Sequence, residues 1–338
     1  MADPPRFPLL LQPTPYQPAP RLAAALGLGR LHVKREDLAG PALGGSKIRS
    51  LELILGAARA ARADSVLAAG ASQSHFCRAL AGCAPRAGLA CHLLLHGAQA
   101  PLGNLLLCRL FGADIGFTDA SDPAIRAQLE TRAAALRLAG GNPFLVHLAG
   151  ETAPLAAAAW ALAAEEMAAD FEAAGSAPDL LVLACGAGLS LAGLALGFAR
   201  YGLPVRLLGV SVRQPAARLR PWVEQVAARA AALLGWDEPA AMAAVTLTDD
   251  QRAPDHDGPG APGLAAVHLA ARTEGLVLDP AASAKALAGL AAAVGGLVPR
   301  GGAAALVHSG GAAALVHSGG LPGLLADSDA VAVGLARG

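Results

Sequence analysis

Three lysines could supply amine chemistry in this chain, and one of them, Lys47, stands at the start of a predicted helix. It ends a Gly-Gly-Ser-Lys segment in which Ser46 is the expected N-cap. The positive end of a helix lowers the pKa of a lysine in its first turn. This favours the neutral amine, the form that attacks a carbonyl to make a Schiff base. The alternative is a solvated surface lysine. A phosphate-binding P-loop is excluded because the GxxxxGK[ST] spacing is absent.

A second segment suited to chemistry is Gly70–Arg78 (GASQSHFCR), which follows the apolar run Ser65–Ala69. A turn of small residues between a strand and a helix presents backbone N–H groups to an anion. Ser72 and Ser74 add hydroxyl donors, so a substrate carboxylate would fit here. The alternative is an ordinary helix N-cap formed by one of these serines.

The third segment is a glycine-containing turn, Cys185–Ser190 (CGAGLS), after the apolar run Leu180–Ala184. Glycine lets a backbone approach phosphate closely, and a helix that begins there supplies N–H groups. The dinucleotide pattern GxGxxG is incomplete, and no acidic residue stands about 20 positions on at the end of a clear second strand. The segment therefore predicts a site for a single phosphate rather than a pyrophosphate.

A tandem repeat occupies residues 301–318, where GGAAALVHS is read twice. A solenoid needs several longer repeats, so a local duplication is the simpler account. Ser309 and Ser318 each follow a short apolar run, where a hydroxyl can bond to a ring nitrogen; the alternative is a plain turn. We expect one copy to enter the sheet and the other to loop out. We favour the second copy, with Ser318, because the glycine pair and the predicted helix after it are intact.

Short apolar runs alternate with helix-like segments and would position these groups. The predicted strands are Ser65–Ala69, Ala90–Leu95, Phe144–His147, Leu180–Ala184, Val205–Val212, Leu276–Leu278 and Ala304–Val307, and the predicted helices include Ser74–Ala87, Leu105–Phe111 and Thr152–Ala173. Continuously apolar strands are typical of sheets covered on both faces. The alternation predicts α/β architecture with parallel sheets, and the length allows two domains.

Composition excludes several classes of protein. The 338 residues carry no net charge, which argues against a nucleic-acid or polybasic membrane surface. The five cysteines include no CxxC pair and the nine histidines no HExxH, so neither a metal site nor a disulfide framework is indicated. The proline-rich N-terminus does not resemble a signal peptide, and we expect a reducing, cytoplasmic compartment. The uncharged stretch Leu180–Ala199 is long enough to cross a bilayer, but its glycines favour a strand, a turn and a buried helix.

In their order along the chain, these segments resemble the pyridoxal-phosphate enzymes of the tryptophan-synthase-β type. The resemblance is to the 1-aminocyclopropane-1-carboxylate deaminase/D-cysteine desulfhydrase family and extends over about residues 8–326. In that family a VKRED…GGNK segment carries the Schiff-base lysine, here Lys47. A QSN segment carries the serine for the substrate carboxylate and an asparagine that contacts the cofactor, here Ser74 and His75. The phosphate loop SGSGGTxAGL is similar to residues 185–194, LDPVYTGKA to residues 278–286, and HTGG to the two His-Ser-Gly-Gly copies.

The chain departs from the family pattern at four positions. His75 replaces the asparagine, and Leu189 replaces a glycine of the phosphate loop. Ala282 replaces the tyrosine of DPVY, and a second family tyrosine aligns near His256. The two tyrosines of the chain lie in neither motif. A mechanism that needs two active-site tyrosines is therefore not available, which favours simple β-elimination over opening of a cyclopropane ring.

The resemblance implies a fold type II, tryptophan-synthase-β-like enzyme with two α/β domains of twisted, parallel-rich sheets flanked by helices. We expect a smaller domain at residues 45–148, a larger one at 1–44 and 149–338, and pyridoxal 5'-phosphate between them. The expected catalytic residues are Lys47 and Ser74. The expected cofactor contacts are Lys47, His75, Cys185, Gly186, Ala187, Gly188, Leu189, Ser190 and Ser318 or Ser309, and the expected substrate contacts are Ser74, His75, Phe76 and His256.

The implied function is a lyase or deaminase that acts on a small amino acid by D-cysteine desulfhydrase-like β-elimination, giving a keto acid and ammonia. The alternatives are a pyridoxal-phosphate-dependent racemase, a 1-aminocyclopropane-1-carboxylate deaminase-like enzyme, or a cofactor-binding protein that has lost catalysis. Turnover of D-cysteine or of a β-substituted alanine separates an enzyme from a binder. We expect a homodimer, and neither a metal, a nucleic acid nor a membrane as partner.

Overall fold

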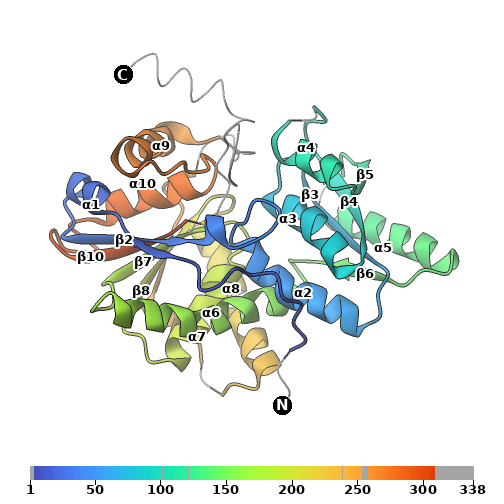
Figure 1. Ribbon diagram of the computed structural model, residues 1–338, viewed down its shortest axis with the longest axis horizontal. Helices are drawn as coiled ribbons and strands as arrows, with labels where there is room; N and C mark the ends of the chain where they lie inside the picture. The colour runs from blue at the N-terminus through green and yellow to red at the C-terminus, as the bar shows by residue number, and fades with distance from the viewer. Residues whose placement is uncertain (1–3, 101, 121, 238, 253–257, 309–338) are drawn as a thin grey trace.

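The computed structural model of the chain describes residues 4–100, 102–120, 122–237, 239–252 and 258–308, which form two β-sheets flanked by helices (Figure 1). The six-stranded sheet has the order β1-β2-β10-β7-β8-β9, and the β1–β2 pair is antiparallel while the other pairs are parallel. Its strands are β1 (Tyr16–Pro18), β2 (Arg30–Arg35), β7 (Leu180–Cys185), β8 (Arg206–Ser211), β9 (Val245–Thr248) and β10 (Ala303–His308).

The second sheet is wholly parallel and has the order β5-β4-β3-β6. Its strands are β3 (Ser65–Ala71), β4 (Ala90–His96), β5 (Asp114–Phe117) and β6 (Pro143–Val146). The parallel-rich α/β class that the sequence predicts is therefore confirmed. The domain boundaries at residues 45–148 remain a prediction.

Ten α-helices connect the strands of the described chain. They are α1 (Pro20–Leu26), α2 (Lys47–Ala60), α3 (His75–Cys83), α4 (Gly103–Leu110), α5 (Asp122–Leu138), α6 (Ala153–Ala173), α7 (Leu189–Arg200), α8 (Ala216–Leu234), α9 (Gly260–Glu274) and α10 (Ser283–Ala293). In Figure 1, α1, α9 and α10 cover one face of the six-stranded sheet, and α6, α7 and α8 cover the other.

The central strand β7 shows why the predicted strands are continuously apolar. Leu180 and Val182 join the hydrophobic cluster formed with α9 and α10, whereas Leu181 and Leu183 join the cluster formed with α6, α7 and α8. Successive side chains of a strand point to opposite faces, so both sets must be apolar. The stretch Leu180–Ala199 is thus a strand, a turn and a helix. No helix of the described residues is long and apolar enough to span a membrane.

Two predicted elements differ in the structure. The run Leu276–Leu278 is mostly buried, but it is an irregular connection between α9 and α10 rather than a strand. The helix predicted over Ser74–Ala87 divides into α3 and a 3₁₀ turn at Ala84–Ala87, where Pro85 has no N–H for the helical hydrogen-bond ladder.

The first copy of the tandem repeat forms the strand β10, between β2 and β7. The expectation that this copy loops out is therefore wrong for residues 303–308. Both copies contain the same continuous apolar run, so the burial of apolar side chains cannot choose between them. The connection from Ala293 to Ala303 is short, and use of the second copy would lengthen it by nine residues. Ser309 and Ser318 lie outside the described residues.

Candidate active site

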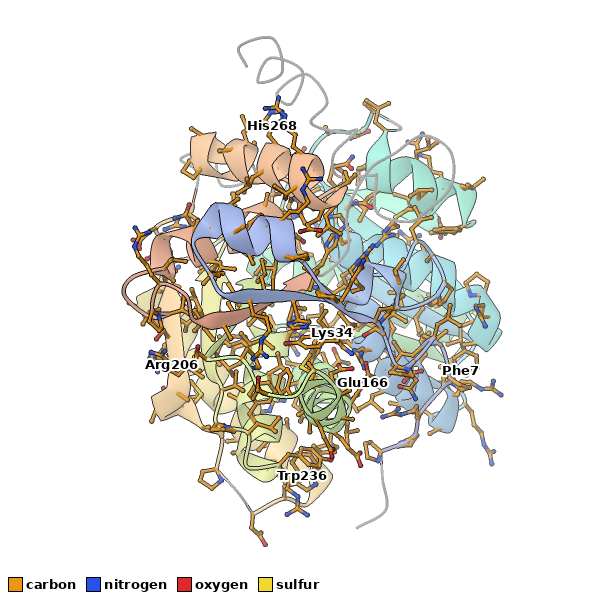
Figure 2. The ribbon with its side chains drawn as sticks, turned by 60° about the vertical axis from the view of Figure 1, so that its left-hand side comes forward. Phe7, Lys34, Glu166, Arg206, Trp236 and His268 are labelled. Carbon is orange, nitrogen blue, oxygen red and sulfur yellow. The ribbon has the colours of Figure 1, made fainter. Side chains whose placement is uncertain are left out.

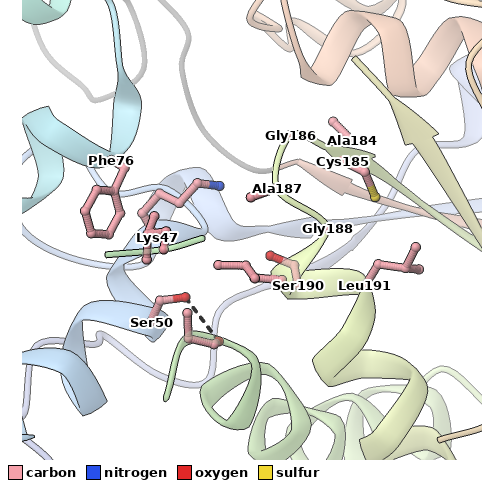
Figure 3. Close-up of a pocket in the computed structure, with 13 residues that line it drawn as sticks. Lys47, Ser50, Phe76, Ala184, Cys185, Gly186, Ala187, Gly188, Ser190 and Leu191 are labelled. Carbon is pink, nitrogen blue, oxygen red and sulfur yellow. Dashed lines mark hydrogen bonds between the residues drawn. The ribbon is translucent and has the colours of Figure 1, made fainter. Parts of the chain in front are cut away.

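A cavity of about 490 Å³, counting its open mouth, lies between the start of α2 and the turn from β7 to α7 (Figure 3). Its lining residues are Lys47, Ser50, Phe76, Leu148, Ala156 and Ala184–Leu191. The structure thus brings together Lys47, Phe76 and the predicted phosphate loop, which are far apart in sequence. Ser50 was missed by sequence reasoning, although it lies three residues after Lys47 and so on the same helix face.

The backbone makes a tight, left-handed turn just before α2, the helix that carries Lys47. Ala42, Leu43, Gly44 and Gly45 all have positive φ, and a Cβ at Gly44 would lie 2.1 Å from the carbonyl oxygen of Asp37. Glycine is therefore required at position 44. The GG of the sequence motif serves this tight approach.

Ser46 does not cap α2 as predicted. Its backbone is already helical and its side chain makes no capping hydrogen bond. Instead the Nζ of Lys47 donates to the Ser46 hydroxyl at 2.9 Å. The Ser46 hydroxyl therefore binds the Lys47 amine instead of capping the helix.

Burial lowers the pKa of Lys47, and the nearby Arg78 lowers it further, while Cys185 and Asp279 act in the opposite direction. The predicted direction agrees, but its main cause is desolvation by tertiary packing rather than the helix end. In Figure 3 the amine of Lys47 extends from α2 toward the loop that contains Gly186 and Ala187. The site thus favours the neutral, nucleophilic amine.

The loop opposite Lys47 has the features of an anion site. Gly188 precedes α7 with a φ of +74°, and a Cβ there would lie 2.6 Å from the Cγ2 atom of Val223. A Cβ at Gly186 would meet open space. Among the described residues, the backbone N–H groups of residues 186–191 find no hydrogen-bond acceptor. Unpaired N–H groups at a helix start fit a phosphate monoester.

Cys185 and Leu189, two further predicted cofactor contacts, also line the cavity. Burial raises the pKa of the Cys185 thiol to about 12, although Lys47 opposes this shift. Cys185 is therefore a neutral thiol and not a reactive thiolate. Leu189 is the buried first residue of α7 and lines the cavity where the family has a glycine.

Ser74 and His75 lie beside Phe76 but do not line the cavity. Ser74 caps α3, since its Oγ accepts a hydrogen bond from the N–H of Cys77 at 3.2 Å. Ser74 is thus the helix N-cap that the sequence offered as an alternative. Its hydroxyl hydrogen can still be donated to a carboxylate.

The ring of His75 is held at both nitrogens. Its Nε2 lies 3.0 Å from Oδ2 of Asp279, and its Nδ1 lies 3.3 Å from Nδ2 of Asn104. Sequence reasoning missed both partners, although Asp279 lies in the segment that is similar to the family's LDPVYTGKA. His256 lies outside the described residues.

A buried ion-pair network holds the strand β2 and the helices α2 and α6 together. Lys34 of β2 contacts Glu166 and Asp170 of α6 at 2.5 and 2.6 Å, and Figure 2 shows Lys34 and Glu166 lying together. Arg49, two residues after Lys47, contacts Glu166 at 2.8 Å and Glu36 at 2.7 Å. Lys34 is therefore held in structural ion pairs. Through Arg49 the same network anchors α2, the helix that carries Lys47.

Comparison with known proteins agrees with this geometry. Residues 8–310 match the family model described as pyridoxal-phosphate dependent enzyme. A D-cysteine desulfhydrase of Yersinia pestis (strain Pestoides F) is 37% identical over 295 residues, which are 85% of this chain and 87% of the relative. A 1-aminocyclopropane-1-carboxylate deaminase of Methylobacterium sp. (strain 4-46) is 33% identical over 297 residues, 84% of this chain and 88% of the relative.

The chain belongs to the 1-aminocyclopropane-1-carboxylate deaminase/D-cysteine desulfhydrase family of pyridoxal-phosphate-dependent enzymes. Its cofactor is pyridoxal phosphate, and it is an enzyme of the lyase and deaminase group. The resemblance that the sequence indicates is therefore confirmed. The roles of single residues remain predictions.

Solved structures support the same family. A crystal structure of a 1-aminocyclopropane-1-carboxylate (ACC) deaminase homologue superimposes with a TM-score of 0.84 and 27% identity, covering 97% of this chain and 96% of its own. A threonine deaminase from T.th. superimposes with a TM-score of 0.64 at 22% identity, covering 90% of this chain and 94% of its own, and shows a shared fold. The fold type II prediction is confirmed.

Proposed function

We propose that this family member catalyses β-elimination from a small amino acid with a leaving group on the β-carbon. The α-proton and the leaving group are lost, and water hydrolyses the resulting unsaturated amino acid to a keto acid and ammonia. The observation that carries the proposal is the pairing, across one cavity, of a buried lysine of lowered pKa with a turn of unpaired N–H groups. These two features fit the aldehyde and the phosphate ends of pyridoxal phosphate. The relatives named above, a desulfhydrase and a deaminase, support the same class of reaction.

The residues of this chain have separate tasks in the proposal. Lys47 would hold the cofactor covalently through Nζ, and its neutral amine would accept the α-proton of the substrate. The N–H groups of residues 186–191 hold the phosphate. The bound cofactor supplies an electron sink for the carbanion at the α-carbon. Phe76, Leu148 and Ala156 exclude water from the reacting atoms.

The α3 N-terminus is the place that we propose for the substrate carboxylate. Ser74 lies next to Phe76, which lines the cavity, and its hydroxyl hydrogen is available for donation. His75, the next residue, is proposed to contact both the substrate and the cofactor. Its ring is held in place by Asp279 and Asn104. His256 is proposed as a substrate contact from the family resemblance alone.

The positions of both tyrosines favour β-elimination over ring opening. Tyr16 stacks on His32 with ring centroids 4.5 Å apart, and Tyr201 packs edge-on against Trp236 at 6.3 Å. Neither lines the cavity, so neither supplies the phenol that is missing from the family motifs. A good leaving group on the β-carbon needs less acid assistance than a cyclopropane ring.

The test is a substrate screen with keto-acid detection. The purified holoenzyme is offered D-cysteine, L-cysteine, β-chloro-D-alanine, D-serine and 1-aminocyclopropane-1-carboxylate, and Lys47→Ala serves as the inactive control. We expect turnover of a β-substituted alanine and none of the cyclopropane. Turnover of the cyclopropane alone would favour the deaminase alternative. Interconversion of enantiomers without keto acid would favour a racemase, and inertness toward all substrates would favour a binding protein.

Borohydride reduction followed by peptide mapping tests the lysine independently of substrate. We expect the pyridoxyl group on Lys47, because Lys34 is bound in ion pairs with Glu166 and Asp170. A label on Lys34 or Lys285 would falsify the assignment.

Assembly and location are further parts of the proposal. All five cysteines are buried free thiols, which supports a reducing, cytoplasmic compartment. A homodimer is proposed from the family resemblance, and light scattering on the holoenzyme tests it. A monomeric mass would exclude the dimer.

A further inference from the structure

The phosphate loop rests on a neighbouring helix through one side-chain hydrogen bond. The indole Nε1 of Trp222, on α8, donates to the carbonyl oxygen of Ala187 at 3.0 Å. The same helix packs against the loop, because a Cβ at Gly188 would lie 2.6 Å from Val223 and 3.0 Å from Leu219. One face of the turn is thus closed by α8.

Peptide geometry then decides where the next N–H group points. The peptide bond between Ala187 and Gly188 is trans and planar, so its C=O and N–H point in opposite directions. Because the carbonyl of Ala187 points to α8, the N–H of Gly188 points away from that helix. The cavity is on that side, since Lys47 and Ser190 line it and no residue of α8 does.

Without the indole, this peptide has an alternative orientation. Gly188 has no Cβ, so a rotation of the preceding peptide costs little conformational energy. A rotated peptide would turn the Ala187 carbonyl toward the cavity. A carbonyl oxygen repels a phosphate, whereas an N–H group binds it.

We propose that Trp222 is a positioning residue for the cofactor phosphate, holding the Ala187–Gly188 peptide so that the Gly188 N–H faces the phosphate. The inference rests on the proposed phosphate site at residues 186–191. It adds a residue from α8 that lies outside the family motifs and does not line the cavity.

The experiment compares Trp222→Phe with a matched control in the holoenzyme. Phenylalanine keeps an aromatic ring but removes the donor. Trp236→Phe is the control, because Trp236 follows α8 and packs against Tyr201 instead of the loop. The readouts are the rate of cofactor release into a trapping protein and the ³¹P chemical shift of the bound phosphate. We expect Trp222→Phe to release cofactor about fivefold faster, equivalent to about 1 kcal/mol, and to shift the ³¹P signal.

A rescue variant separates the hydrogen bond from simple packing. In Trp222→His the imidazole superimposes on the five-membered half of the indole, so its Nε2 takes the place of Nε1. We expect this variant to retain cofactor better than Trp222→Phe at equal thermal stability. Equal loss in both variants would mean that the ring volume matters and the donor does not, which would overturn the inference.

Ser190 lines the cavity at the start of α7, and its hydroxyl is a proposed side-chain donor to the phosphate beside the N–H groups. Ser190→Ala removes that donor and so distinguishes failure of the inference from failure of the phosphate site. If Ser190→Ala changes both readouts and Trp222→Phe changes neither, the phosphate site stands and the role of Trp222 is wrong. If neither variant changes cofactor release or the ³¹P signal, the loop does not hold the phosphate and both proposals fail.

Discussion

Nε2 of His75 lies 3.0 Å from Oδ2 of Asp279, although 204 residues separate them in the chain. His75 begins α3 beside the four-stranded sheet, and Asp279 precedes α10 beside the six-stranded sheet. The tautomer of the ring follows from its neighbours. The amide Nδ2 of Asn104 donates to the carbonyl oxygen of Gln73 at 2.7 Å, so it also presents a donor to Nδ1 of His75. The ring proton is therefore on Nε2 and is donated to Asp279.

Loss of this hydrogen bond should destabilise the fold. Asp279 is only 2% exposed, and its Oδ1 has no partner among the described residues, so His75→Phe leaves a buried carboxylate without its donor. We expect the free energy of unfolding in urea to fall by about 2 kcal/mol. The control is His92→Phe, which breaks the surface pair with Asp114 and should cost under about 0.5 kcal/mol. Equal effects of the two variants would contradict the special role of the buried pair.

Lys47 should make the stability of the cofactor-free protein depend on pH. Burial lowers the pKa of Lys47 in the folded protein below the ordinary value of 10.5, which applies to the unfolded chain. At a pH between the folded and the unfolded pKa, the unfolded chain therefore binds more protons than the folded chain. Stability therefore rises with pH across that window, and below it the buried amine is destabilising. Lys47→Met should raise the melting temperature of the cofactor-free protein at neutral pH and flatten its rise toward pH 10. A steeper rise in the variant would refute this.

Glu166 should protect the fold against acid. Burial alone would raise its pKa, but hydrogen bonds and charges from Arg49 and Lys34 lower it to about 2. This contribution is present above the ordinary value of 4.5 and is lost as the pH falls through about 2. Glu166→Gln should cost about 3 kcal/mol in the free energy of unfolding at neutral pH and lose less stability than wild type between pH 4.5 and 2.

The neighbouring Glu165→Gln is the control, since Glu165 is exposed. Asp170, whose pKa burial raises, is present in both variants and in the wild type. An equal acid response of the two variants would show that the network does not depend on the charge of Glu166.

Because the first repeat copy forms β10, we propose Ser309 rather than Ser318 as the serine that contacts the pyridine nitrogen of the cofactor. Ser309 directly follows His308, the last residue of the central strand β10, in sequence. We therefore expect Ser309→Ala to change the absorption spectrum of the bound cofactor and Ser318→Ala to leave it unchanged. The opposite pattern would return the site to the second copy, and two unchanged spectra would remove this serine role.

Local pattern in the sequence predicts much of the fold and part of the site. Short, continuously apolar runs such as Leu180–Ala184 favour strands covered on both faces, and the GGSK and CGAGLS turns place a lysine and a predicted phosphate site next to helix starts. These signals are short-range, since each is contained within a few residues. The identity of the cofactor came from the order of these signals along the chain, which resembles one family.

Only the tertiary structure decides which distant residues meet. The sheet order places β10, the last described strand, beside β2, the second strand. It therefore shows that the first repeat copy enters the sheet, which the sequence cannot show because the two copies are identical. The pairs His75–Asp279 and Lys34–Glu166, and the bond from Trp222 to Ala187, join segments 204, 132 and 35 residues apart. No local periodicity encodes such contacts, because each depends on how sheets and helices pack in three dimensions. The same packing, rather than the helix end, is the main cause of the lowered pKa of Lys47.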